Sequence, residues 1–247
     1  MMQCTGGGSG VGGGGASEPI VYDLRLKHDS SILVAGPSGS GKTYFVEDLI
    51  ANKLAMFDIP PSAIFWCYGQ YQDRLERLKR EHGVYLVQGL PDTLLEELPP
   101  NSMLVVDDLM SEVGNSKLVT ALFTKVSHHR HVTVIFLTQN LFQKGAESRT
   151  RSLNSSYIVL MKNPRDASQI RHLAAQMFPE NPKYLINVYQ NAIAAGPYSH
   201  LLLDLRQETP DKLRLRTRAK LPQSRGANAN SQDREVIVYL PATHRRL

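Results

Sequence analysis

Eight consecutive residues, GPSGSGKT, form the stretch of this sequence best suited to binding phosphate. The apolar run SILVA precedes them and YFVEDLIANKLAMF follows, so we expect a strand before them and a helix after them. Glycines allow backbone N–H groups to converge on phosphate oxygens, and a helix N-terminus adds the positive end of its dipole. The residues of this predicted ATP-binding loop are Gly36, Pro37, Ser38, Gly39, Ser40, Gly41, Lys42 and Thr43.

The loop matches the pattern G-x-x-x-x-G-K-[ST] in the strand–loop–helix context that the pattern requires. Lys42 would place a cation on the outer phosphates of ATP, where charge develops during hydrolysis. The hydroxyl of Thr43 would be a ligand for Mg²⁺. A glycine-rich turn could match the pattern by chance, but the two correct flanks argue against that alternative.

Two carboxylates end a second apolar run, SMLVVDDLM. At the carboxyl edge of a parallel sheet, Asp107 would reach the Mg²⁺ beside Thr43. Asp108 could then orient or deprotonate the attacking water, although Asp is one methylene shorter than the Glu found in many such enzymes. The alternative is a strand-end turn, in which Asp is favoured for conformational reasons.

A third buried run, VTVIFLTQN, ends in Gln139. An amide at this strand end could contact the γ-phosphate or hold the attacking water. Taken alone, a capping or loop glutamine is the simpler interpretation.

Together these segments resemble a known group of proteins. GPSGSGKT, then VVDDLM, then HHRHVTVIFLTQN closed by Gln139, is similar to the FtsK and HerA superfamily of DNA-translocating ATPases. Within it, the resemblance is greatest to the poxvirus-type genome-packaging ATPases of large DNA viruses and of virus-like transposons. It covers roughly residues 20 to 205, including YIVLMKNPRDASQIRHLAAQMFP, and RHVTVIFLTQN is its most specific part.

The resemblance implies a homo-oligomeric ring that hydrolyses Mg²⁺-ATP and pumps double-stranded DNA into a capsid shell, with capsid proteins as further partners. It also implies an arginine that reaches the ATP of a neighbouring subunit. Arg130, just before the strand that ends in Gln139, is the first candidate, and Arg149 and Arg151 are the rivals. For any one of the three taken alone, an ordinary surface arginine with no role is the simpler interpretation.

The elements that must position these residues follow from apolar patterning. Several strand-length runs are apolar throughout, which is typical of strands covered on both faces, and most are separated by segments long enough for a helix. These features predict an α/β fold of the P-loop NTPase kind, with a mainly parallel central sheet flanked by helices and a C-terminal β hairpin. The predicted strands cover 31–36, 63–68, 83–89, 102–108, 132–139 and 157–163, and the predicted helices 44–57, 71–83, 117–129, 164–178 and 181–196.

The sequence divides into three predicted regions. Residues 1–18 are rich in glycine and lack apolar periodicity, so we expect disorder there. Residues 19–205 would form the ATPase domain. Residues 206–247 would form a basic hairpin and tail, because this region contains ten Lys and Arg against four Asp and Glu while the whole chain has a net charge of +5.

Within the basic region, KLRLRTRAK alternates cations with Leu and Thr. As a strand it would turn a row of like charge outward, formed by Lys212, Arg214, Arg216 and Arg218. Such a row suits the phosphates of a DNA backbone. The alternative is a charged edge strand that merely prevents aggregation.

Composition restricts the setting. No apolar run approaches the roughly 18 to 20 residues of a membrane-spanning helix, and the N-terminal segment lacks the apolar centre of a signal peptide. The two cysteines lack metal-site spacing and suit a reducing compartment. We therefore expect an intracellular protein with no membrane partner, located in a viral assembly site or virion if it is viral.

Two functions of different class remain open. The first is a motor that converts ATP hydrolysis into DNA movement. The second is an ATP-gated assembly factor that recruits a capsid or recombination partner without moving DNA. A small-molecule kinase shares the phosphate loop, but the chain lacks an evident arginine-rich lid and pairs its two aspartates with a strand-end glutamine.

Overall fold

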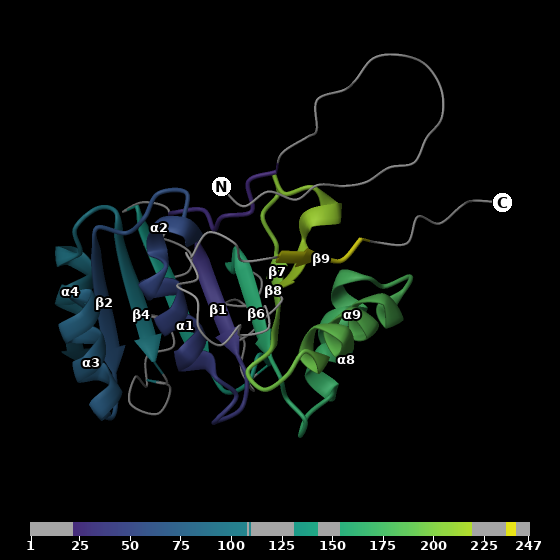
Figure 1. The fold of residues 1–247 in the computed structure, drawn as a ribbon, viewed down its shortest axis with the longest axis horizontal. Coiled ribbons are helices and arrows are strands. Elements are labelled where there is room, and N and C mark those ends of the chain that lie inside the picture. The colour runs from purple at the N-terminus through teal and green to yellow at the C-terminus, as the bar shows by residue number, and fades with distance from the viewer. Residues whose placement is uncertain (1–21, 108, 110–130, 143–153, 219–235, 241–247) are drawn as a thin grey trace, which may run out of the picture.

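The computed structural model describes residues 22–107, 109, 131–142, 154–218 and 236–240. Within these ranges the strands form one nine-stranded sheet in the order β3-β2-β4-β5-β1-β6-β7-β8-β9 (Figure 1). The strands are β1 (Ser31–Ala35), β2 (Ala63–Tyr68), β3 (Tyr85–Gln88), β4 (Ser102–Asp107), β5 (Val132–Thr138), β6 (Tyr157–Met161), β7 (His200–Asp204), β8 (Leu215–Arg218) and β9 (Val236–Val238). The helices are α1 (Lys42–Ala51), α2 (Lys53–Met56), α3 (Asp73–His82), α4 (Asp92–Glu97), α8 (Ser168–Met177), α9 (Pro182–Ala194) and the short 3₁₀ helix η3 (Asp211–Leu213).

Parallel pairing extends from β3 to β6, and β1 lies between β5 and β6. The last three strands pair in antiparallel fashion, β6 with β7, β7 with β8 and β8 with β9. The structure therefore confirms the predicted α/β fold with a mainly parallel central sheet and a C-terminal hairpin. Because the strands from β3 to β6 run in one direction, their carboxyl ends meet at one edge of the sheet.

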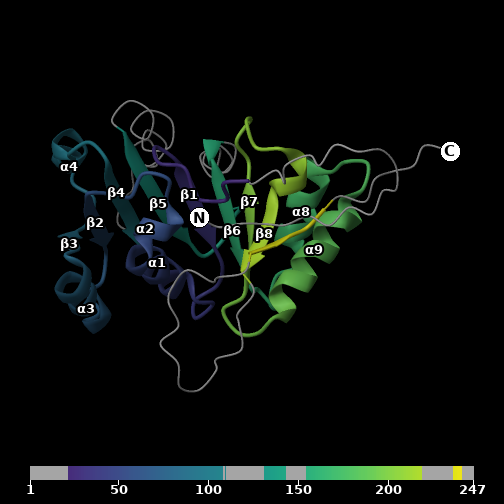
Figure 2. The same ribbon diagram turned by 45° about the horizontal axis from the view of Figure 1, so that its top comes forward.

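Both faces of the sheet are covered, which explains the uninterrupted apolar runs. In β1, Ile32 and Val34 belong to one core cluster with residues of α1 and α3. Leu33 and Ala35 belong to a second cluster with residues of α8 and α9. Figure 1 shows α1 in front of the sheet, and Figure 2 shows α8 and α9 near β7 and β8. Alternate side chains of one strand thus serve two separate cores.

Some elements differ from their predicted extents. The helix predicted over 44–57 is divided at Asn52, whose side-chain amide donates a hydrogen bond to the Asp48 carbonyl oxygen at 2.8 Å. The short helix α4 was not predicted. The helix predicted over 117–129 lies outside the described residues. No helix in the described ranges is long and apolar enough to cross a membrane.

The outward row of cations predicted for KLRLRTRAK is wrong at Arg216. This residue is 5% exposed, and its guanidinium pairs with the Asp204 carboxylate at 2.5 Å and donates to the Leu24 carbonyl oxygen at 2.9 Å. The alternation rule placed it in solvent, but the N-terminal segment covers this face of β8 and β9 extends the sheet beyond it. Arg216 therefore holds the fold together and is not exposed to a DNA backbone.

Arg214 is also bound by other residues of the fold. Its guanidinium donates to the backbone oxygens of Asp204 and Arg206 at 3.2 and 2.7 Å and pairs with Asp211 at 2.8 Å. Lys212 lies over the ring of Tyr22 at 4.6 Å. The side chain of Arg218 lies outside the described part of the chain.

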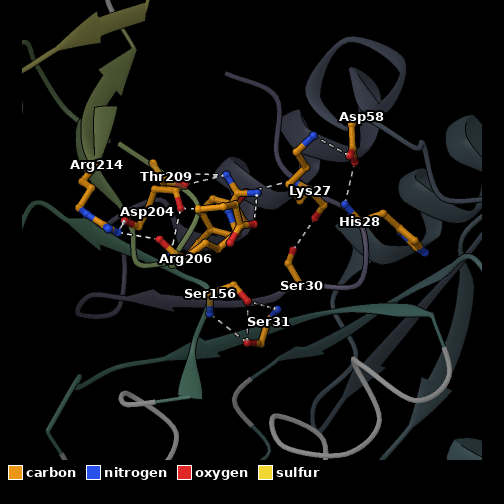
Figure 3. A network of polar contacts seen from close by, with 12 residues as sticks. Lys27, His28, Ser30, Ser31, Asp58, Ser156, Asp204, Arg206, Thr209 and Arg214 are labelled. Atoms are coloured by element: carbon orange, nitrogen blue, oxygen red, sulfur yellow. Dashed lines mark hydrogen bonds and ion pairs between the residues drawn. The ribbon is translucent and has the colours of Figure 1, made fainter. Parts of the chain in front are cut away.

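Asp204 is the centre of this network (Figure 3). It is 1% exposed, and Arg206 and Arg216 both pair with it. The Arg206 guanidinium also lies over the ring of Tyr157 at 5.1 Å, and the Tyr157 hydroxyl accepts a hydrogen bond from the Lys27 backbone N–H at 3.0 Å. The network thus joins the entry to β1, the start of β6 and the two strands of the hairpin.

Removing the shared carboxylate should destabilise the protein more than removing an exposed one. Asp204→Ala would leave the buried Arg216 without its counter-ion and Arg206 with the exposed Glu208, so we expect the free energy of unfolding to fall by about 3–5 kcal/mol. Asp211→Ala is the matched control, because the Asp211 side chain is 87% exposed and Arg214 is its one ion-pair partner among the described residues; a change of about 0–1 kcal/mol is expected there. Urea unfolding followed by circular dichroism measures both. Equal effects of the two substitutions would contradict the structural role of Asp204.

Candidate nucleotide-binding site

The phosphate loop connects the end of β1 to the start of α1, as the sequence predicted. Gly39 and Gly41 adopt φ angles of 77° and 97°, a region that strongly favours glycine. Gly36 has a different constraint, because a Cβ atom there would lie 2.6 Å from Cβ of Met161 and 2.7 Å from Oγ of Ser40. The loop therefore requires glycine for backbone conformation at two positions and for close packing at the third.

Lys42 is the first residue of α1, and its ammonium folds back over the loop. The Nζ atom donates to the carbonyl oxygens of Gly36 at 2.7 Å and Pro37 at 3.1 Å. The cation is thereby held against the first two residues of the loop. A charge-assisted contact with a phosphate oxygen from this position would reinforce the helix dipole.

A cavity of about 460 Å³ opens at the carboxyl edge of the sheet, over this loop. Seven of the predicted site residues line it, and they are Ser38, Gly39, Gly41, Lys42, Thr43, Asp107 and Gln139. The structure therefore brings the phosphate loop and the two strand-end side chains into one space. Asp108, Arg130, Arg149 and Arg151 lie outside the described residues.

Strand register explains why these side chains meet. Ala35 of β1 lies opposite Thr138 of β5, and the Gly36 backbone N–H donates to the Thr138 carbonyl oxygen at 3.1 Å. Asp107 of β4 lies opposite Leu137 of β5, on the other side of that strand. The end of β5 therefore lies between the phosphate loop and Asp107, which places Gln139 at the centre of the edge.

The oxygen donors at this edge fit a Mg²⁺ ion. Thr43 offers a hydroxyl and Asp107 a carboxylate, both hard oxygen ligands. The described residues contain no cluster of three or more His, Cys, Asp or Glu side chains that could hold a metal unaided. Mg²⁺ is usually held by one or two protein groups together with substrate phosphates and water.

Sequence reasoning missed the lip of this cavity, formed by Tyr44, Arg74 and Tyr198. The Arg74 guanidinium lies 5.0 Å from the centre of the Tyr44 ring, and the rings of Tyr44 and Tyr198 are 5.6 Å apart. A Cβ atom on Gly41 would lie 2.6 Å from the Tyr198 ring, so this ring packs directly on the loop. Tyr198 also has a positive φ of 63°, which is uncommon for a bulky residue.

One signal could have found part of this lip. Arg74 follows the strand-end segment Tyr68–Gln72 closely, and polar residues just after parallel strands gather at the carboxyl edge. Tyr198 gave no such signal, because it precedes the antiparallel strand β7. The start of an antiparallel strand lies at the carboxyl edge of its parallel neighbour, and this follows only once β7 is known to pair with β6.

A second cavity, also of about 460 Å³, lies beside the loop. Residues of the phosphate loop, the segment after β6 and the segment before β7 line it, among them Pro37, Lys162, Arg165 and Tyr198. Ser38, Gly39 and Tyr198 border both cavities. The loop thus separates a space lined by Lys42, Thr43 and Asp107 from one whose described lining holds no carboxylate.

The sheet, the loop and the converging strand ends define an α/β fold of the P-loop NTPase type. No protein-family model matches the chain, and neither does any curated protein sequence. Among solved structures, the chain is similar to the genome packaging NTPase B204 from Sulfolobus turreted icosahedral virus 2 in complex with sulfate. The identity is 14%, the likeness covers 74% of this chain and 95% of that chain, and the TM-score is 0.46.

The two left-handed glycines of the loop should differ in their tolerance of alanine. Alanine at either position carries a conformational cost on the order of 1–2 kcal/mol. At Gly41 the added Cβ also meets the Tyr198 ring, whereas at Gly39 it would meet no atom within 4 Å. Isothermal titration with Mg²⁺-ATP should therefore show a loss for Gly41→Ala that exceeds the loss for Gly39→Ala by about tenfold or more. A Gly39→Ala protein that binds no better than Gly41→Ala would contradict this account of the loop.

Proposed function

We propose that this protein is a Mg²⁺-dependent ATPase that translocates double-stranded DNA, in the packaging of viral DNA into a capsid. The observation that carries the hydrolytic part is the single cavity in which Lys42, Thr43, Asp107 and Gln139 meet. A cation, two metal ligands and a strand-end amide are the groups that hydrolysis of a nucleoside triphosphate requires. The translocating part depends on the resemblance of VVDDLM and RHVTVIFLTQN to packaging ATPases.

Each group has a defined task in this proposal. Lys42 binds the outer phosphates, and Thr43 and Asp107 hold Mg²⁺, which would neutralise charge on the phosphate oxygens. A water oxygen forms a bond to the γ-phosphorus as the bond to the β–γ bridging oxygen breaks, giving ADP and inorganic phosphate. Asp108 accepts the proton of that water, and Gln139 orients it or contacts the γ-phosphate.

In this proposal the second cavity binds the nucleoside part of ATP. Of these two cavities, the first is the one that Lys42, Thr43 and Asp107 line, so the phosphates would lie there and the base and ribose beyond the loop. Tyr198 borders both spaces and offers an aromatic face at the point where they meet.

The proposed motor is a homo-oligomeric ring inside the host cell, working with capsid proteins at an assembly site. Residues 19–205 form its ATPase domain and residues 206–247 a basic hairpin and tail. Because Arg214 and Arg216 are bound to other parts of the chain, the DNA-contacting surface belongs elsewhere than on these two side chains.

Steady-state ATP hydrolysis with and without double-stranded DNA tests the proposal. A motor is expected to hydrolyse ATP faster when it engages DNA, and Lys42→Ala should abolish turnover with or without DNA, because the phosphates lose their charge-assisted contact. Hydrolysis that ignores DNA but responds to a capsid protein would support the assembly factor instead. Wild-type protein that neither binds nor hydrolyses Mg²⁺-ATP would contradict both the motor and the assembly-factor hypotheses.

The proposed trans arginine predicts an effect that crosses subunits. Arg130→Ala subunits should bind ATP normally but turn it over more slowly by a factor on the order of 10³ or more. Mixing them with wild-type subunits should restore turnover at their sites, because the missing charge belongs to the neighbour. A fully active Arg130→Ala ring would transfer this role to Arg149 or Arg151.

A further inference from the structure

We propose that Arg74 is a cis-acting cation that contacts the terminal phosphate of ATP bound to the same subunit. This inference rests on the proposed ATPase function and adds a residue that the phosphate-loop pattern does not contain. Arg74 lines the cavity that also holds Lys42, Thr43 and Asp107, although it lies in the first turn of α3. Its charge therefore reaches the phosphate side of the site from a different element.

The donors of Arg74 are available to a ligand. Among the described residues, none accepts a hydrogen bond from its guanidinium or forms an ion pair with it. Its contact is with the face of Tyr44, at 5.0 Å from the guanidinium carbon to the ring centre. An aromatic face fixes the plane of a guanidinium without using its N–H groups, so no described residue occupies the five donors that phosphate oxygens would need.

Tyr44 is the positioning residue for this cation. It follows Thr43 directly, in the first turn of α1, so the ring under Arg74 is attached to the residue proposed to hold Mg²⁺. The α1 and α3 helices both begin at the carboxyl edge of the sheet, after β1 and β2 respectively. Their first turns therefore place Arg74 on the side of the cavity where the outer phosphates and the metal belong.

Helix stability alone gives no reason for a cation at this position. The first turn of a helix has a positive potential, which favours Asp and Glu and disfavours Arg. Arg77, one turn later, shows what a structural arginine of α3 does: it pairs with Glu47 of α1 at 3.6 Å. Burial raises the pKa of Glu47, and the charges of Arg74 and Arg77 oppose that rise. Arg77 is thus a natural control, because it lies on the same helix and interacts electrostatically with the same Glu47 but does not line the cavity.

The test compares Arg74→Ala, Arg74→Lys and Arg77→Ala in the full-length protein. For Arg74→Ala we expect kcat to fall by a factor on the order of 10² or more, because arginines on the transferred phosphate contribute factors of about 10³ to 10⁵. Arg74→Lys should retain part of the activity, since it keeps the charge but loses the planar fork. Arg77→Ala should keep the wild-type kcat.

A binding measurement separates phosphate contact from packing. The affinities for ADP and for the non-hydrolysable triphosphate AMP-PNP, both with Mg²⁺, give a preference for the γ-phosphate. Arg74→Ala should lower this preference about tenfold, which is the effect of losing one charge-assisted contact. Equal weakening of ADP and AMP-PNP would assign Arg74 to packing on Tyr44 and overturn the proposal.

Mixed rings supply the final distinction. Because Arg74 acts within its own subunit, the turnover of mixtures with wild-type subunits should rise only in proportion to the wild-type fraction. Recovery beyond that proportion would place Arg74 in a neighbour's site and contradict the cis assignment. Wild-type protein without AMP-PNP binding or ATP turnover would instead refute the proposed ATPase function, so the two failures can be told apart.

Discussion

The parallel pairing of β1 with β5 on one side and β6 on the other is the constraint on which the site depends. Ala35 lies opposite both Thr138 and Leu160, so three strands end at one level. The Gly36 backbone N–H continues the β5 ladder by one bond, which fixes where the chain leaves the sheet. A slip of one residue would reverse every side chain of β1 between the two cores and displace the loop from Asp107 and Gln139.

The two edges of the sheet carry different kinds of polar residues. At the amino edge, Tyr157 of β6 lies opposite Asp204 of β7, and the buried carboxylate collects Arg206 and Arg216. Burial lowers the pKa of Arg216 and Asp204 opposes that change, as expected for a charge retained only through its partner. At the carboxyl edge, polar groups instead face a cavity. Charged groups thus pair with one another at the amino edge, whereas at the carboxyl edge Lys42, Arg74 and Asp107 line the cavity.

The sequence allowed prediction of the parts that are local along the chain. The phosphate loop is continuous, and Asp107 and Gln139 each end an apolar run, so a parallel sheet sufficed to bring them together. The order of the strands in the sheet could not be predicted from their spacing in the sequence. The position of β5 between β4 and β1 was therefore not predicted either. The failure at Arg216 has the same origin, since alternation in one strand cannot reveal that a segment 192 residues away covers it. Asp108 and Arg130 stay predictions.

Charge balance shows why a second cation belongs in this cavity. Of the described residues that line it, Lys42 and Arg74 are the cationic ones and Asp107 is the acidic one. In the proposed site Asp107 would hold the metal, but its charge would repel the phosphates that the metal binds. Lys42 alone would cancel that carboxylate and leave the triphosphate to Mg²⁺ and the backbone N–H groups. Arg74 restores an excess of positive charge, and its place on Tyr44 spares the free-energy cost of ordering a flexible side chain when ATP binds. In this proposal the lip is therefore part of the phosphate site, although the loop pattern does not contain its residues Arg74 and Tyr198.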